Sequence, residues 1–193
     1  LEMIEGKEHL YRQLATNFLT HNHDVPARLH RAQQQGDLKI IADRGQYFNH
    51  VEEIYQNLSK HPDVVAVTRT IEGKVAMEYV DNQAYATLKG VEEDFIQVNR
   101  LDTFVYEGSY DFSKRNDVPQ ALFGSVVASK LKANILNDVQ PVRVYYIPQE
   151  SNLTNPASIR TDFLYPAGFF SVQLEYDEKY IISDFQAVSD LLG

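Results

Sequence analysis

Two neighbouring runs of alternating apolar and polar residues, 75–79 and 84–88, constrain the fold of this chain most. In the first run, Val75, Met77 and Tyr79 alternate with Ala76 and Glu78. In the second run, three apolar residues alternate with more polar ones in the same way: Ala84, Ala86 and Leu88 against Tyr85, Thr87 and Lys89. A period of two places every second side chain on one face of a strand. With an Asp-Asn turn at 81–82, the two runs predict a β-hairpin.

Further strands are predicted from short β-branched and aromatic runs bounded by turn residues. They cover residues 37–42, 64–67, 142–147 and 163–174, the last broken by Pro166 and Gly168. Between the last two strands, residues 148–160 are polar and contain two prolines, and they predict a long loop. A loop of this length inside a compact domain is usually functional or disordered.

Helices are predicted where apolar residues recur at helical spacing behind a capping residue. Residues 51–58 carry one apolar stripe. Asp117, three residues before Gln120 and with Pro119 between them, predicts the start of a second helix that continues through 123–131. Ser183 and Gln186 predict a capping box for a third helix that ends near residue 192.

Residues 1–36 differ in texture from the rest. A polar amphipathic helix is predicted around 10–18, and a second short helix over 29–35, ended by Gly36. His21 and His23 are close neighbours, which suggests a metal site. Their spacing is not the i,i+4 spacing that sets two ligands on one helical face, so we favour a helix-turn-helix with scattered histidines.

Composition excludes several classes of protein. The formal net charge of -9 argues against nucleic-acid binding, which needs clustered lysine and arginine. The absence of cysteine excludes disulfides and thiolate metal sites. No run approaches the roughly 18 consecutive apolar residues of a membrane helix, and the first residues lack the pattern of a secretion signal. A membrane protein containing this chain would therefore carry its spans elsewhere.

Catalytic motifs are missing. There is no Gly-x-Ser-x-Gly elbow, phosphate loop, dinucleotide fingerprint or His-Glu-x-x-His motif. The carboxylate pairs at 92–93 and 177–178 are predicted in exposed turns, where nothing would raise their pKa for acid catalysis. We therefore expect no enzymatic activity, no cofactor and no metal.

Aromatic residues are abundant, with twelve tyrosines, ten phenylalanines and no tryptophan. Five of them gather late in the chain: Phe163, Tyr165, Phe169, Phe170 and Tyr176. Strands prefer aromatic residues and bury them, which is the simpler interpretation. The functional interpretation is an apolar surface that accepts a lipid-bearing or hydrophobic partner.

The order of several short blocks resembles a known family. The blocks are Asp37-Leu38-Lys39-Ile40, residues 62–67, the Gly-Val-Glu-Glu-Asp-Phe segment at 90–95, Gly124 with Ala128 and Leu131, Tyr146-Ile147-Pro148, residues 166–170 and residues 180–192. In this order they are similar to the extracytoplasmic, periplasmic domain of ABC-transporter permeases of the lipoprotein-release and macrolide-export type. The similarity covers residues 37–192, and residues 1–36 lie outside it.

The resemblance implies an α+β fold with two lobes. Residues 37–68 and 179–193 would form a βαβ-type membrane-proximal lobe, and residues 69–178 a β-rich distal lobe. Since the chain ends before the last βαβ unit of the family, the proximal lobe would be incomplete. It would then expose a sheet edge that another chain could pair with, in a homodimer or heterodimer.

The resemblance also implies a function on the periplasmic side of the inner membrane. The domain would bind lipoprotein, other hydrophobic cargo or a periplasmic partner during ATP-driven release or export, and its ATPase subunit would join through a separate membrane part. In the lipoprotein-release branch a loop at 148–160 docks the carrier, which makes Leu153, Pro156 and Arg160 the expected partner-binding residues. The loop lacks the family's Pro-Met-Gly-x-Ile-Pro pattern.

Three alternatives stay open. A related permease domain regulates a cell-wall hydrolase instead of moving cargo. A free-standing periplasmic binding module would have the same composition. A metal-dependent enzyme that uses the N-terminal histidines is the most distant alternative.

Overall fold

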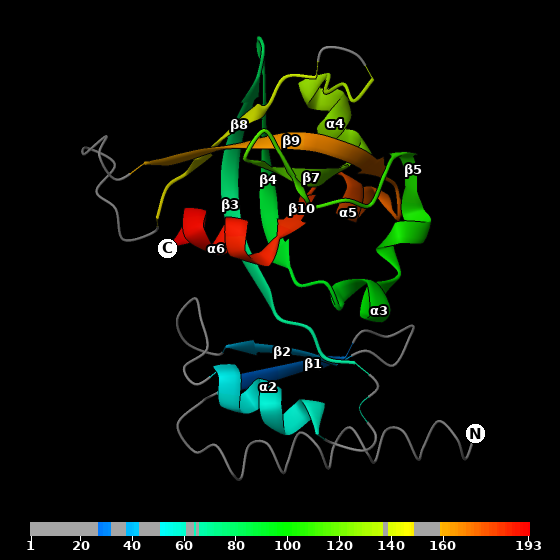
Figure 1. The fold of residues 1–193 in the computed structure, drawn as a ribbon, viewed down its shortest axis with the longest axis vertical. Helices are drawn as coiled ribbons and strands as arrows, with labels where there is room; N and C mark the ends of the chain where they lie inside the picture. Colours follow the sequence, from blue (N-terminus) through cyan, green and yellow to red (C-terminus); the bar gives the residue numbers. More distant parts are fainter. Residues whose placement is uncertain are drawn as a thin grey trace. The chain divides into compact units, whose positions relative to one another are not determined.

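A computed structural model describes residues 27–31, 38–42, 51–60, 64, 66–136, 139–148 and 159–193. The chain divides into two compact units, Leu1–Val64 and Val65–Gly193 (Figure 1). Each unit is described by itself.

The first unit contains a two-stranded antiparallel sheet and one helix. Strand β1 (Ala27–Arg31) pairs with β2 (Leu38–Ala42) so that Leu29 lies opposite Ile40. Helix α2 (Val51–Ser59) buries Ile54. The predictions of a strand at 37–42 and a helix at 51–58 are confirmed. The helix around 10–18, His21 and His23 lie outside the described residues.

The prediction of a helix over 29–35 is wrong for residues 29–31, which belong to β1. In this short run Leu29 stands between Arg28 and His30, which is the alternation of a strand. Antiparallel pairing with β2 extends along all five residues of β1, and this long-range pairing outweighs a weak local helix preference.

Six strands of the second unit close into a ring in the order β9-β8-β3-β4-β10-β7, because β7 also pairs with β9. The strands are β3 (Thr70–Tyr79), β4 (Asn82–Val91), β7 (Val118–Gly124), β8 (Val142–Tyr146), β9 (Arg160–Phe170) and β10 (Tyr180–Asp184). The pairings β4–β10 and β7–β9 are parallel, and the other four are antiparallel. Two short strands, β5 (Val105–Gly108) and β6 (Lys114–Arg115), extend the sheet outside the ring.

The β3–β4 hairpin confirms the strongest sequence prediction. Val75, Met77 and Tyr79 are buried, as are Ala84 and Ala86 on β4, whereas Tyr85 on the opposite face is 79% exposed. The two-residue turn lies at 80–81, one residue earlier than predicted. The strand predicted over 142–147 is confirmed as β8.

Two helices complete the main core of this unit. Helix α4 (Ser125–Leu131) contributes Val127 and Leu131, and α6 (Phe185–Leu192) contributes Val188 and Leu192. Helix α6 packs closely on the hairpin where β4 has a glycine: a Cβ added at Gly90 would lie 2.8 Å from Cβ of Val188. The small residue at this position therefore sets how closely the helix approaches the sheet.

The N-cap of α6 is Asp184, whose Oδ1 accepts a hydrogen bond from the backbone N–H of Ala187 at 3.0 Å. The predicted cap, Ser183, is one residue too early. Ser183 is fully buried in β10 and donates to the carbonyl of Gln120 at 2.6 Å. Helix α6 itself is confirmed.

The helix predicted to start after Asp117 is wrong in its first half. Residues 118–124 form β7, and α4 begins at Ser125. Asn116 and Asp117 have φ angles of 52° and 64°, and both positions form the two-residue turn between β6 and β7. Two consecutive residues with positive φ are the mark of a tight hairpin turn, for which asparagine and aspartate are favoured.

Two further predictions need correction. Val64 and residues 66–69 are not in a strand, and β3 begins only at Thr70. Strand β9 is not broken at Pro166, because its register shifts by one residue near Ala167 and pairing with β7 then continues. It also ends at Phe170, before the predicted end at 174.

The mixture of helices and strands expected for an α+β protein is present. Residues 179–193 were grouped with 37–68 in the expected proximal lobe, but β10 lies between β4 and β7 and so belongs to the sheet of the second unit. Among the residues described, no helix has the length and apolar character needed to cross a bilayer.

Candidate functional site

The most unusual surface of the second unit is formed by residues 101–108 and 171–178, here called the β5–α5 surface. It comprises the 3-10 helix η1 (Leu101–Phe104), β5, residues 171–173 after the end of β9, the short helix α5 (Leu174–Asp177) and Glu178. These two segments carry half of the ten large apolar side chains that are exposed in the described part of the chain: Phe104, Tyr106, Val172, Leu174 and Tyr176. Leu174 is 69% exposed and Tyr106 is 58% exposed. Such a concentration of exposed apolar side chains is typical of an interaction site.

The two segments lie side by side because β5 pairs with the end of β9 (Figure 1). Val105 lies opposite Phe170, and the backbone N–H of Ser171 donates to the carbonyl of Phe104 at 3.0 Å. The ring of Tyr106 lies 6.4 Å from the ring of Phe169. Tyr106 is therefore presented by paired backbone, and Phe104 and Val172 lie next to that pairing.

A buried carboxylate holds residues 171–177 in place. Asp177 is only 4% exposed, and its oxygens accept hydrogen bonds from Ser171 Oγ at 2.7 Å, the N–H of Val172 at 2.8 Å and Ser125 Oγ at 3.2 Å. A buried charge is tolerated when several donors stabilise it. Gly124 completes the arrangement, because a Cβ at this position would collide with the backbone of Asp177. These contacts join α5 to the start of α4 and turn Leu174 and Tyr176 outward.

A second apolar cluster lies beneath this surface. Its buried members are Val91, Phe95, Leu101, Leu122, Phe170 and Ile182. Phe95 comes from helix α3 (Phe95–Asn99), and Leu122 and Ile182 come from β7 and β10. This packing connects η1 and β5 to the strands of the six-stranded ring, so the surface has an apolar core of its own beneath it.

The surface is acidic. Residues 101–108 and 171–178 contain five carboxylates and no lysine or arginine. Partial burial, together with the negative charges of Glu107 and Asp177, raises the pKa of Tyr106. Two basic residues stand just outside: Arg100 lies 3.6 Å from Asp102, and Lys179 lies over the ring of Tyr180 at 4.7 Å.

The polar groups of this site hold its backbone in place. All six histidines precede residue 62, so the second unit has no imidazole to act as a base beside Ser171 or Asp177. In the described parts of the chain, no three His, Asp or Glu side chains come together as metal ligands. The donors around Asp177 are hydroxyl and amide groups that fix backbone, which is a structural role.

The residues predicted for partner binding are placed as follows. Leu153 and Pro156 lie outside the described residues. Arg160 is the first residue of β9, and its guanidinium donates to the carbonyl of Leu191 in α6 at 3.3 Å. Its role in partner binding stays a prediction.

The late aromatic cluster divides between the core and the surface. Phe169 and Phe170 are 5% and 1% exposed, whereas Tyr176 is 48% exposed and stacks on Tyr180 with ring centroids 6.0 Å apart. Burial of strand aromatics is therefore the right interpretation for Phe169 and Phe170. Tyr176 is the one member that reaches the β5–α5 surface.

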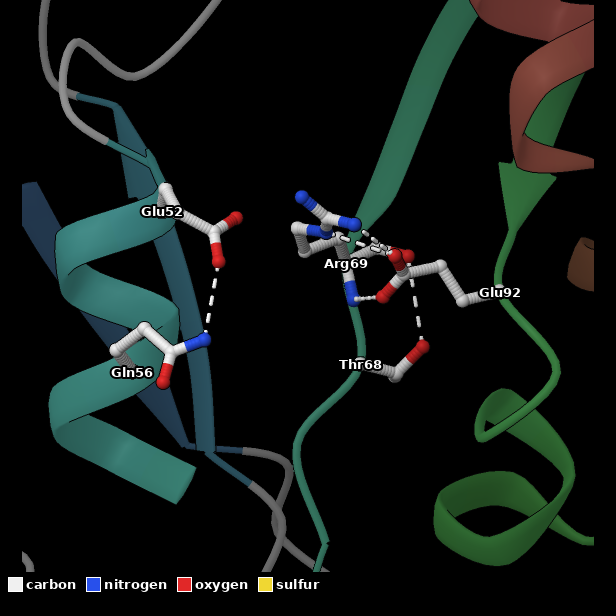
Figure 2. A network of polar contacts seen from close by, with 5 residues as sticks. All are labelled: Glu52, Gln56, Thr68, Arg69 and Glu92. Carbon is white, nitrogen blue, oxygen red and sulfur yellow. Dashed lines mark hydrogen bonds and ion pairs between the residues drawn. The ribbon is translucent and has the colours of Figure 1, made fainter. Parts of the chain in front are cut away.

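The acidic segment after β4 serves structure. Glu92 Oε2 accepts from the backbone N–H of Arg69 at 3.0 Å, and Oε1 accepts from its guanidinium, with Nε at 2.7 Å (Figure 2). The guanidinium also lies 5.5 Å from the ring of Phe185 in α6. Figure 2 further shows the hydrogen bond from Gln56 to Glu52 along helix α2, at 3.0 Å. The Arg69–Glu92 pair fixes the start of β3 against the end of β4.

Comparison with known proteins gave matches among solved structures. No protein-family model matches the chain, and no curated protein matches it. Among solved structures, it is similar to the extracellular domain of the noncanonic ABC-type transporter YknZ from Gram-positive bacteria, with a TM-score of 0.47 and 12% identity. The match covers 72% of this chain and 64% of that one, which is less than two thirds of its length. At this identity and TM-score the similarity does not establish a shared function.

Proposed function

We propose that this chain is a non-catalytic extracytoplasmic domain of an ABC-transporter permease, on the periplasmic side of the inner membrane. Its β5–α5 surface binds lipoprotein, other hydrophobic cargo or a periplasmic partner during ATP-driven release or export. The observation that carries this proposal is the concentration of exposed apolar side chains on the β5–α5 surface, with Leu174 and Tyr176 held outward by the buried carboxylate of Asp177.

The non-catalytic part of the proposal is supported by the chemistry of the second unit. It has no histidine and no cysteine, and the one buried carboxylate among its described residues, Asp177, already accepts three hydrogen bonds. A general base needs a free position within hydrogen-bond reach of a substrate proton. Asp177 is engaged with the protein's own backbone and hydroxyl groups.

The permease part of the proposal is supported by the order of sequence blocks over residues 37–192. The ATPase subunit would join through a membrane part outside this chain. Leu153, Pro156 and Arg160 are proposed as a second contact region for a carrier or other protein partner.

The first test is the coding sequence on either side of this chain. Membrane helices on both sides are expected for a permease. A signal peptide followed directly by this chain and a stop codon would refute the permease assignment and favour a free-standing binding module.

The second test uses the intact transporter with its ATPase subunit. Leu174→Ser with Tyr176→Ser should abolish most transport while the protein still reaches the membrane and retains basal ATP hydrolysis. Transport is measured as lipoprotein retained in the inner membrane and as macrolide susceptibility. The matched control is Tyr85→Ser, which removes an aromatic side chain that is 79% exposed on β4.

Normal transport together with normal cell-wall hydrolase activity in the double variant would refute a role for the β5–α5 surface. If transport is normal in every variant but cell-wall hydrolase activity at division falls in the double variant, the surface regulates a hydrolase and the cargo assignment is wrong.

A further inference from the structure

We infer that the β5–α5 surface binds a basic, extended segment of a partner polypeptide, which pairs along the free edge of β5. This inference rests on the proposed function and names the class of partner that the same surface takes. Three properties of the surface support this inference: an available strand edge, apolar side chains near that edge, and a negative charge.

The first property is the strand edge. In the second unit, closure of the six-stranded ring pairs both edges of its strands, so the ends of the strand order are β5 and β6. Strand β6 consists of Lys114 and Arg115 alone, and short charged strands are a common protection against edge pairing. Strand β5 has four residues and carries Val105 and Tyr106. An exposed edge of this kind accepts an added strand through backbone hydrogen bonds.

The second property is the apolar side chains on β5 and on the segment that follows its partner strand β9. Tyr106 is on β5 itself, and Val172 and Leu174 are on the neighbouring segment that follows β9. A strand added to an edge places alternate side chains on the same face, so its apolar residues would contact these groups. Backbone pairing would supply affinity and these contacts would supply selectivity.

The third property is charge. Three glutamates border the apolar side chains: Glu107 on β5, and Glu175 and Glu178 on and after α5. Opposite charges across an interface steer association and select partners. The partner segment should therefore alternate apolar residues with lysine or arginine.

The same charge disfavours two other occupants. In a symmetric pair of copies, the surface would face itself and bring its glutamates near their own equivalents. A membrane surface rich in anionic lipid would be repelled by an acidic rim. A basic polypeptide is the occupant that the charge favours.

The experiment measures binding of a defined probe to the full chain. The probe is a short acetylated peptide of four Lys-Val repeats, labelled with a fluorophore. Two control peptides are used: four Glu-Val repeats, and the Lys-Val peptide N-methylated at every residue, which lacks backbone N–H donors on both edges. Fluorescence anisotropy gives the affinity, and amide chemical shifts locate the bound peptide.

We expect the Lys-Val peptide to shift amides of residues 105–108 and 171–178. Leu174→Ser with Tyr176→Ser should weaken binding about tenfold, and so should Glu107→Gln with Glu175→Gln. N-methylation at every residue should weaken it to a similar extent, whereas Tyr85→Ser should leave it unchanged. Raising NaCl from about 0.05 M to about 0.5 M should weaken it several-fold, since salt screens exposed charges.

Equal binding of the N-methylated peptide would refute pairing along β5. Equal binding of the Glu-Val peptide, or no binding of the Lys-Val peptide, would refute a basic partner. Self-association of the chain through residues 105–108, or binding to anionic vesicles through them, would replace the inferred occupant with a second copy or a membrane.

The two proposals fail in different ways. If the transport assay shows that Leu174 and Tyr176 are required but the peptide does not bind, the proposed function stands and this inference is wrong. If transport does not depend on these residues, the proposed function itself is wrong.

Discussion

Replacement of Asp177 tests whether this carboxylate holds the β5–α5 surface together. Its oxygens accept three hydrogen bonds, from Ser171 Oγ, the N–H of Val172 and Ser125 Oγ, at 2.7 to 3.2 Å. Hydrogen bonds to a charged group contribute about 1.5–3 kcal/mol each. Both serine hydroxyls can turn to other acceptors, so the three contributions do not add in full. We expect Asp177→Ala to lower the free energy of unfolding by about 3–4 kcal/mol.

The asparagine variant should behave differently. Asp177→Asn keeps one acceptor oxygen and adds an N–H₂ group that a serine hydroxyl can accept from. Asp177→Asn should lower the free energy of unfolding by about 1–2 kcal/mol. The matched control is Asp190→Asn, which removes a carboxylate that accepts from Gln186 on the exposed side of α6 at 2.7 Å. A change at such a surface position should stay within about 0.5 kcal/mol.

Urea unfolding followed by tyrosine fluorescence suits this chain, which has twelve tyrosines and no tryptophan. A loss of 3–4 kcal/mol should lower Tm by about 6–16 °C. Hydrogen exchange adds a local measure. In Asp177→Asn, amides of residues 171–178 should lose more protection than amides in the strands of the six-stranded ring. The reasoning is refuted if Asp177→Ala stays within about 0.5 kcal/mol of the unchanged protein, or if Asp190→Asn costs as much.

Three further predictions concern other parts of the second unit. Gly90→Ala should lower the free energy of unfolding by about 1–3 kcal/mol because backbone and Cβ atoms of α6 block the new methyl group. At Gly73→Ala the new methyl group meets only the flexible end of the Leu192 side chain, so the loss should be under about 1 kcal/mol. Thermal unfolding ranks the two variants. Burial, and secondarily the charge of Asp102, raises the pKa of Tyr110 to about 12. The contribution of Tyr110 to the free energy of unfolding should therefore be present below pH 10 and be lost as pH rises toward 12. Tyr110→Phe should reduce this dependence of stability on pH, measured by alkaline unfolding. Glu92→Gln should cost up to about 1 kcal/mol through its half-buried pair with Arg69, and the loss should shrink in high salt; an unchanged loss would contradict an electrostatic origin.

Local alternation predicted the β3–β4 hairpin well because one face of both strands is buried. Val75 and Met77 enter the core and Tyr85 stays in solvent, so the pattern and the burial agree. The prediction failed where a short pattern was compatible with more than one local structure. The spacing of Asp117 and Gln120 imitates a capping box, but Asn116 and Asp117 form a tight turn that leads into β7. The two-residue Asn-Asp turn between short runs was the available signal for a hairpin.

The closed ring could not be read from the sequence. Its parallel pairings join β4 with β10 and β7 with β9, which are far apart along the chain. No local pattern specifies which distant strands become neighbours.

The candidate site was missed for a related reason. Residues 169–174 were predicted as one strand, and in sequence Phe170, Val172 and Leu174 look like one alternating face. In the structure Phe170 is 1% exposed and Leu174 is 69% exposed, because the chain turns at Ser171 and Asp177 holds the turn. Exposure here depends on a hydrogen-bonded carboxylate that has no signature at the sequence level.

The position of β10 has a consequence for synthesis of the chain. It is the last strand of the ring in chain order, yet it lies between β4 and β7. Until residues 180–184 emerge from the ribosome, β4 and β7 in the nascent chain each have an unpaired edge that a neighbouring molecule can occupy. A ribosome-associated chaperone that shields those edges until β10 has emerged should therefore raise the yield of folded protein.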